Sequence, residues 1–344
     1  MTRFSLDLYV ELRPQARGRV RTRDTRIQAR RGVLLKNIRL KEATQKRYQA
    51  QLARFRLTLH TIQVEFSPHD VDFDESVAER YVQHLYEAGR PRSWASDFLC
   101  GIQDAYPRLR GCLRHAWRSL TAWEICEPAL RAPPLPRSVL AALCGLAVAQ
   151  GRHDLMVFFL LGFHCYLRPS ELLNLCPTDI AIHSDLSGVI ALENTKTSRR
   201  KRALEHVDIE DPVVALLVLL LKQQPRATTR IFDFNYATVR AYFRDFMGQL
   251  GISVHGFRLY SLRRGGAAWD FRNTGSIDRS LHRGRWGSYR AASLYLTDAK
   301  ASAVRLSFEA DVVVLLRQYE ARFASYICQV GGAGIGTSLV TSSL

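Results

Sequence analysis

The chain has 344 residues, with 49 Lys and Arg against 32 Asp and Glu, which gives a formal net charge of +17 at pH 7. This length suits two domains that each bury a core of their own. The basic excess indicates a polyanionic partner, and nucleic acid is favoured over a membrane because no lipidation signal or basic amphipathic anchor is visible. A basic protein whose charges only face solvent is the alternative.

The cysteine pattern and the apolar runs narrow the class of protein further. The seven cysteines are scattered and none is spaced as Cys-x-x-Cys, which argues for a reducing compartment and against a disulfide framework or a zinc site. The longest apolar runs, residues 155–167 and 213–221, are shorter than the ~20 residues of a membrane-spanning helix. No secretory signal is visible, so we expect an intracellular protein without a transmembrane segment.

Charge and proline content divide the first part of the chain. Residues 1–42 are rich in arginine and are expected to form a flexible basic arm, which is a phosphate clamp, a nuclear address or a solubilising tail. Residues 43–130 show helical periodicity with arginines among the aromatic residues, as in a helical domain that grips a duplex backbone. Residues 131–137 hold three prolines and are predicted to be a linker, because consecutive prolines cannot continue a helix.

The second part is predicted to form one mixed α+β domain over residues 138–325. A buried helix pair is expected over residues 155–175, broken near an Arg-Pro step. Strands are expected at 188–192 and 202–209, because apolar and polar residues alternate there. They flank a polar, basic turn at 194–200, so the sequence predicts a β-hairpin with a basic tip.

The end of the chain offers two further expectations. An apolar stripe within residues 302–324 recurs at helical spacing and packs either on its own domain or on a neighbouring copy. Residues 326–344 are rich in Gly and Ser and are predicted to be a tail without packing. The expected fold class is therefore mainly α with a small β-hairpin, in a helical domain followed by a mixed domain.

Four segments of the second domain carry residue types that suit metal-free cleavage of a phosphodiester. Arg168, in Arg-x-x-Glu spacing with Glu171, and Arg263 offer guanidinium groups that can donate two hydrogen bonds to a phosphate. Tyr295 offers a nucleophile once cationic neighbours favour its ionised form. Lys196, at a flexible turn, can protonate a leaving alkoxide. Taken singly, such residues are more often surface ion pairs, solvated charges or core aromatics.

The order and gaps of these segments resemble the motifs of the tyrosine recombinases, the phage integrase family. Leu167–Leu172 resembles the first-arginine box, and Lys196 stands where that family has its hairpin lysine. Tyr260–Ala268 resembles the second-arginine box, usually written His-x-x-Arg, and Gly284–Leu296 resembles the last two boxes, with a tryptophan nine residues before a tyrosine. The Arg-Arg-Gly-Gly and Gly-Arg-Trp sequences are similar to those of DIRS-type recombinases from eukaryotic mobile elements.

The resemblance implies a role for each of the matching residues. Arg168 and Arg263 would grip the scissile phosphate, and Glu171 would support the site. Lys196 would protonate the leaving 5′ oxygen. Tyr295 would be the covalent nucleophile.

Other candidates surround these residues. Trp286 would donate its indole N–H to a phosphate and pack the site. Tyr260 stands where His or Lys is usual, which leaves the general-base step open because tyrosine is a poor base near neutral pH. Further contacts to DNA are expected from four arginines of the hairpin tip and the later boxes: Arg199, Arg200, Arg264 and Arg285.

The activity implied is DNA strand cleavage and rejoining, as in site-specific recombination or integration, through a 3′-phosphotyrosyl intermediate. It needs no metal or other cofactor, takes double-stranded DNA as partner, and implies two to four copies of the chain on DNA in the nucleus. Three alternatives stay open: a catalytically inactive DNA-binding relative, favoured by Tyr260, a type IB topoisomerase-like relaxing enzyme, and an RNA-binding or structural basic protein.

Overall fold

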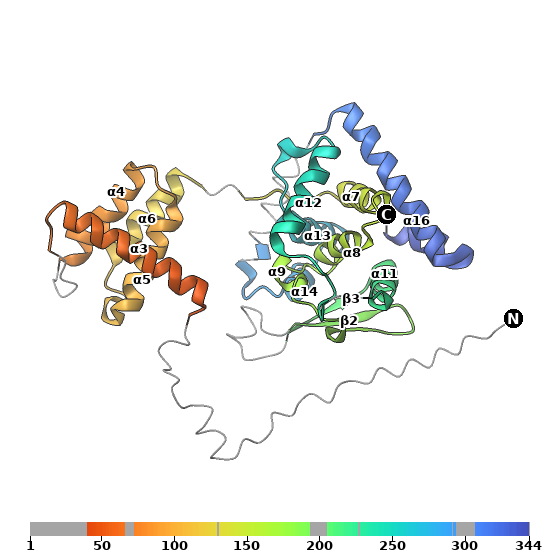
Figure 1. Ribbon diagram of the computed structural model, residues 1–344, viewed down its shortest axis with the longest axis horizontal. Coiled ribbons are helices and arrows are strands. Elements are labelled where there is room, and N and C mark those ends of the chain that lie inside the picture. The colour runs from red at the N-terminus through yellow and green to blue at the C-terminus, as the bar shows by residue number, and fades with distance from the viewer. Residues whose placement is uncertain are drawn as a thin grey trace, which may run out of the picture. The chain divides into compact units, whose positions relative to one another are not determined.

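A computed structural model describes residues 40–65, 72–128, 131–192, 205–225, 228–290, 292–293 and 307–343. The chain forms two compact units, Met1–Leu130 and Arg131–Leu344. Most of the described residues are helical, and the second unit also holds a three-stranded sheet (Figure 1). The predicted fold class, mainly α with a small β-sheet, is confirmed. No helix among the described residues is long and apolar enough to span a bilayer.

The first unit is a helical bundle around an aromatic core. The rings of Phe55, Tyr81 and Phe98 pack against one another. The ring centroid of Phe55 lies 4.8 Å from that of Tyr81 and 4.6 Å from that of Phe98. The Asp74 carboxylate accepts hydrogen bonds from two backbone N–H groups at the start of the last helix, which satisfies donors that a helix leaves open at its first turn. Its helices are α3 (Glu42–Thr61), a π-helical turn (Asp74–Glu79), α4 (Arg80–Glu87), α5 (Arg92–Ala105), a 3-10 turn (Pro107–Leu109) and α6 (Arg114–Cys126).

The second unit is built around one fully buried helix. Every residue from Leu155 to His164 is buried in α8, and helices α7, α11 and α13 pack on it. Such a helix, apolar on all sides, can only lie in a core. Its helices are α7 (Arg137–Ala149), α8 (His153–His164), α9 (Pro169–Leu172), α11 (Pro212–Gln223), α12 (Tyr236–Gln249), α13 (Leu259–Thr274), α14 (Ile277–Gly284) and α16 (Ala310–Ser343), with 3-10 turns at Pro177–Asp179 and Ser253–His255.

The sheet contains the two strands expected from the sequence and one more. Strand β2 (Gly188–Leu192) pairs antiparallel with β3 (Glu205–Ile209) and, on its other side, with β1 (Ile180–Ile182). Ile190 is buried in the middle strand, opposite Ile180 and Val207. The sequence did not predict β1, because three residues are too few to show alternation. The turn between β2 and β3 lies outside the described residues.

The Arg-Arg-Gly-Gly sequence allows α13 to approach the backbone of two other segments. A Cβ atom on Gly266 would lie 1.9 Å from the carbonyl oxygen of Phe163, and one on Gly265 would lie 2.1 Å from that of Leu135. The backbone N–H of Leu135 donates to the carbonyl oxygen of Ser261 at 3.0 Å. The linker predicted at 131–137 is therefore packed at its end rather than free.

Helix α16 packs on its own unit, along α7 (Figure 1). The approach is close, because a Cβ atom on Gly145 of α7 would lie 1.8 Å from the carbonyl oxygen of Tyr319. Leu316, Phe323 and Ile327 are buried there. The apolar stripe thus covers its own core, and packing continues into the range expected to be a tail, because Ile327 is buried and the helix runs to Ser343.

The contact at Gly266 gives a test of this packing. We expect Gly266→Ala to destabilise the second unit by about 1–3 kcal/mol, because the methyl group meets a backbone carbonyl that cannot move freely. Gly248→Ala in α12 is the matched control, since its Cβ would lie 3.8 Å from the nearest atom and alanine gains up to ~1 kcal/mol of helix propensity. Hydrogen exchange of the α8 amides measures both effects. Equal protection in the two variants would contradict the packing argument.

Candidate active site

Glu171 is the carboxylate that holds the first candidate arginine. Arg168 is the N-cap residue of α9 and its Nη1 donates to Glu171 Oε1 at 2.5 Å, while its backbone N–H donates to Glu171 Oε2 at 2.8 Å. Burial raises the pKa of Glu171, but Arg285 and Arg168 outweigh it and hold the pKa below its usual range. The carboxylate therefore stays charged and fixes Arg168, whose side chain is 30 % exposed.

Arg285 binds the same carboxylate from another segment. Its Nη2 donates to Glu171 Oε2 at 2.8 Å, and its Nη1 lies 3.7 Å from Glu205 Oε2. The residue follows α14 in a left-handed conformation with φ 53°, which a non-glycine residue adopts at a cost. Arg285, expected to contact DNA, is buried between two carboxylates in this structure.

Arg263 lies at the centre of the candidate site and is fully buried. Its Nη1 donates to the carbonyl oxygen of Tyr166, and its Nη2 donates to that of Gly284 at 2.5 Å. Its guanidinium carbon lies 5.6 Å from the ring centroid of Trp286, which is itself buried. Arg263 thus joins the turn after α8, the end of α14 and the indole, and both of its Nη groups are engaged within the protein.

The remaining candidates differ in exposure. Tyr260, in the first turn of α13, is 38 % exposed, whereas Arg264 is 3 % exposed. Burial lowers the pKa of Arg168. The nearby Glu171, and to a smaller extent Tyr260, raise it by more, so the pKa lies above its usual value. Arg168 and Tyr260 therefore lie near each other, and both side chains are partly exposed to solvent. Four of the predicted site residues lie outside the described part of the chain: Lys196, Arg199, Arg200 and Tyr295.

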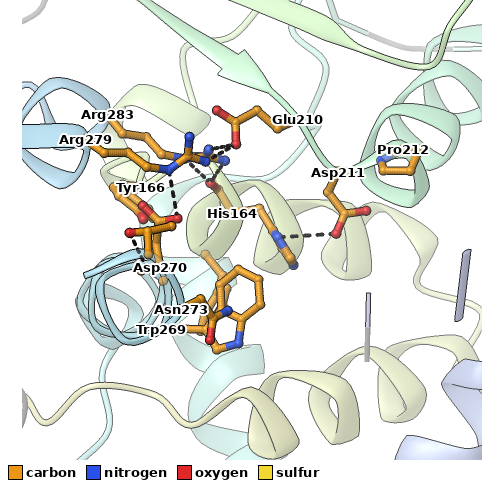
Figure 2. A pocket seen from close by; sticks show the side chains of 13 residues that line it. His164, Tyr166, Glu210, Asp211, Pro212, Trp269, Asp270, Asn273, Arg279 and Arg283 are labelled. Carbon is orange, nitrogen blue, oxygen red and sulfur yellow. Dashed lines mark hydrogen bonds and ion pairs between the residues drawn. The ribbon is translucent and has the colours of Figure 1, made fainter. Parts of the chain in front are cut away.

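Beside this site lies a cavity of about 300 Å³ that the sequence did not indicate (Figure 2). Two arginines of α14 line it. Arg283 donates to the carbonyl oxygen of His164 through Nε at 3.0 Å and Nη2 at 2.6 Å, and Arg279 Nε lies 3.2 Å from Asp270 Oδ1. Both arginines form ion pairs with Glu210. In so basic a chain these arginines resemble solvated surface charges, so no sequence signal sets them apart.

His164 ends the buried helix α8 and faces a carboxylate. Its Nδ1 lies 3.6 Å from Asp211 Oδ2, and Asp211 also caps α11 by accepting hydrogen bonds from Val213 N and Val214 N. Burial lowers the pKa of His164 to about 4, with Asp211 opposing the shift and Arg137 and Arg283 adding to it. The imidazole is therefore neutral near pH 7. Within the described residues, no group of three His, Cys, Asp or Glu side chains could hold a metal ion.

The fold is that of the tyrosine recombinases and integrases, as the motifs led us to expect. No family model and no curated protein matches the sequence. Among solved structures, the XerH site-specific recombinase in a post-cleavage complex with its palindromic difH substrate is similar at a TM-score of 0.55 and 11 % identity, covering 76 % of this chain and 78 % of that one.

Two further solved structures resemble the chain to a comparable degree. The lambda integrase dimer bound to a COC′ core site has a TM-score of 0.52 at 16 % identity, covering 83 % of this chain and 77 % of its own. The Tn1549 transposon integrase in complex with transposon right-end DNA has a TM-score of 0.52 at 12 % identity. The match covers 82 % of this chain and 98 % of the integrase chain. At such low identity these structures establish the fold.

The buried histidine makes stability depend on pH. The folded pKa of His164 is about 4 against ~6.5 when unfolded, so the unfolded chain binds the extra proton and stability falls as the pH drops below ~6.5. We expect a loss of about 2 kcal/mol between pH 7 and pH 5 from this residue. Exchange of the α8 amides, corrected for the intrinsic effect of pH, measures the loss.

His164→Gln should remove most of that pH dependence, because glutamine does not titrate. His206→Gln, which replaces an exposed histidine on β3, is the control and should leave it in place. The window above pH 5 avoids Glu171, whose carboxylate takes up its proton only at lower pH because its folded pKa is depressed. An unchanged profile in His164→Gln contradicts the assignment.

Proposed function

We propose that the protein cleaves and rejoins DNA strands through a 3′-phosphotyrosyl intermediate. The observation that carries this proposal is the convergence of Arg168, Arg263 and Trp286. These residues come from three separated segments and are connected through Glu171 and backbone carbonyl groups. They do so in a fold whose solved examples include proteins bound to DNA. A cluster of guanidinium groups stabilises the charge that develops on a phosphate during transfer.

In the proposed reaction the Tyr295 oxygen attacks a DNA phosphorus atom and the bond from phosphorus to the 5′ oxygen breaks. Lys196 donates the proton that turns this leaving oxygen into a 5′-hydroxyl group. The 5′-hydroxyl of a second strand then attacks the phosphotyrosine and releases Tyr295, so the bond energy is conserved and no ATP is needed. Arg168 offers the exposed phosphate ligand, because Glu171 holds one part of its guanidinium and leaves the rest open.

The role of Arg263 in this scheme follows from its burial. Its Nη groups already donate to carbonyl oxygens of Tyr166 and Gly284 and the side chain is fully buried, so a phosphate can reach it only if these contacts rearrange, for example by exchange with the carbonyl oxygen of Gly284. An exchange at Gly284 would release the turn that precedes Trp286. We therefore propose that phosphate binding by Arg263 is coupled to a rearrangement at the end of α14.

Full burial of Arg263, together with Tyr260 at the usual place of a base, also supports a second candidate function. This is a DNA-binding protein that has kept the fold and lost the chemistry. A relaxing enzyme of the type IB topoisomerase kind would use the same residues without a partner duplex. Action on the DNA of a mobile element, a nuclear location and assembly of two to four copies on DNA belong to the recombinase proposal.

A covalent adduct tests the proposed chemistry. We expect the wild-type protein, incubated with nicked duplex DNA of mixed sequence, to form a protease-sensitive protein–DNA adduct that Tyr295→Phe abolishes. Tyr289→Phe is the control, because Tyr289 lies only three residues after Trp286, is 58 % exposed, and should leave the adduct intact. If the protein binds DNA tightly and in a salt-sensitive way but forms no adduct, even on DNA that contains its target site, the result would favour the catalytically inactive relative. If the protein neither binds the DNA nor forms an adduct, the proposal is overturned.

The first unit offers a separate test of DNA binding. Trp94 in the first turn of α5 carries two guanidinium groups, with Arg54 of α3 at 4.2 Å and Arg90 at 5.4 Å from its ring centroid. The indole concentrates two cations where a helix N-terminus already favours anions. We propose that a DNA phosphate lies there.

Arg54→Ala should then lower the slope of log Kobs against log salt by about 0.9, which is the loss of one phosphate contact. Arg56→Ala on the same helix is the matched control, because it removes the same charge on the other side of buried Phe55. Equal slopes for the two variants would place the DNA elsewhere on this unit. Fluorescence anisotropy over a series of salt concentrations gives the slopes.

A further inference from the structure

The turn that leads from α8 to Arg168 is strained and needs support. Tyr166 has φ 48°, a left-handed conformation that is unfavourable for a residue other than glycine. It is buried, and Arg168 follows two residues later as the N-cap of α9. The direction in which Arg168 leaves the core is therefore set by the backbone of residues 164–168.

Two arginines, the fully buried Arg263 and the largely buried Arg283, hold this turn by its carbonyl groups. Arg263 donates to the carbonyl oxygen of Tyr166. Arg283 donates twice to the carbonyl oxygen of His164, at 3.0 and 2.6 Å, and its guanidinium carbon lies 5.4 Å from the ring centroid of Tyr166 (Figure 2). Arg283 thus contacts both the start of the turn and the side chain of its strained residue.

Arg283 is in turn held by the carboxylate of Glu210, which belongs to a small network of ion pairs. Glu210 forms ion pairs with Arg283 and with Arg279, and Asp270 pairs with Arg279 at 3.2 Å. Burial lowers the pKa of Arg283, but Cys165, Tyr166 and Glu210 raise it, with a net rise. The guanidinium therefore keeps its charge in the interior, where hydrogen bonds from a charged donor are strongest.

We propose that Arg283 is a positioning residue for Arg168, which it controls through the strained turn and without contact to the substrate. The inference rests on the proposed function of Arg168 as a phosphate ligand. Arginine suits the task better than lysine, because its planar fork reaches one carbonyl with two N–H groups and a carboxylate with a third. Arg263 and the core packing of Tyr166 and Leu167 support the same turn, so Arg283 acts together with them.

Hydrogen exchange of the full chain, without DNA, tests the turn itself. In Arg283→Gln we expect the amides of residues 166–168 and 170–172 to exchange roughly tenfold faster or more, because two charged hydrogen bonds are lost. Arg279→Gln is the matched control. It removes the ion pairs to Glu210 and Asp270 but leaves the hydrogen bonds from Arg283 to the His164 carbonyl oxygen in place. If these amides keep their protection, or if all α8 amides lose it equally, Arg283 has no specific hold on the turn and the inference fails.

A double-mutant cycle on duplex DNA tests the link to Arg168. Arg283→Gln should weaken binding about tenfold in the wild-type background and leave it unchanged when Arg168→Ala is already present, while Arg283→Lys restores part of the loss. Additive effects would overturn the inference. If the wild type fails to bind DNA, the proposed function falls, and the exchange experiment still decides whether Arg283 holds the turn.

Discussion

The structure of the second unit depends on how its buried guanidinium groups are satisfied. A buried cation is costly unless a counter-charge or hydrogen-bond acceptors surround it. The Glu171 carboxylate meets this need for the buried Arg285 and also holds the half-buried Arg168, and backbone carbonyl oxygens meet it for Arg263. The left-handed residues Tyr166 and Arg285 belong to the segments that bring these acceptors and donors together.

This arrangement would make the proposed binding of a phosphate a competition for these N–H donors. An anion that takes an N–H donor already held by Glu171 or by a backbone carbonyl oxygen must break that contact, so part of its binding free energy is spent in breaking internal contacts. For Arg168 the competitor is a carboxylate that also holds Arg285, whereas for Arg263 it is a carbonyl oxygen at either end. A phosphate of the wrong geometry would not replace both, which favours discrimination over raw affinity.

The sequence could predict which segments meet, but it could not predict how deeply they are buried. The Arg-x-x-Glu spacing singled out Arg168 and Glu171 together, and they are paired. Arg264 and Arg285 resemble surface charges in a chain of net charge +17, yet both are buried. The burial of Arg285 depends on Glu171 and Glu205, acceptors from distant segments, and no local pattern indicates such partners.

The errors at the edges of the fold have similar causes. The end of α16 has Gly and Ser residues that are typical of a tail, whereas the earlier part of the helix packs on α7 through the close approach of Tyr319 to Gly145, which lies far away in the sequence. Arg283 was missed because an arginine three residues before Trp286 gives no sign of the carbonyl group that it binds. In both cases a tertiary contact overrides local propensity.

The exposed pair of Arg168 and Tyr260 bears on how the chemistry could proceed without a histidine. Near neutral pH a phenol is a hydrogen-bond donor rather than a base, so Tyr260 can support a phosphate oxygen but cannot take the proton of an attacking hydroxyl. The proton would have to pass to water or to the phosphate itself. Such a route needs strong stabilisation of the phosphate charge, and that requirement falls on Arg168 and on the turn that directs it.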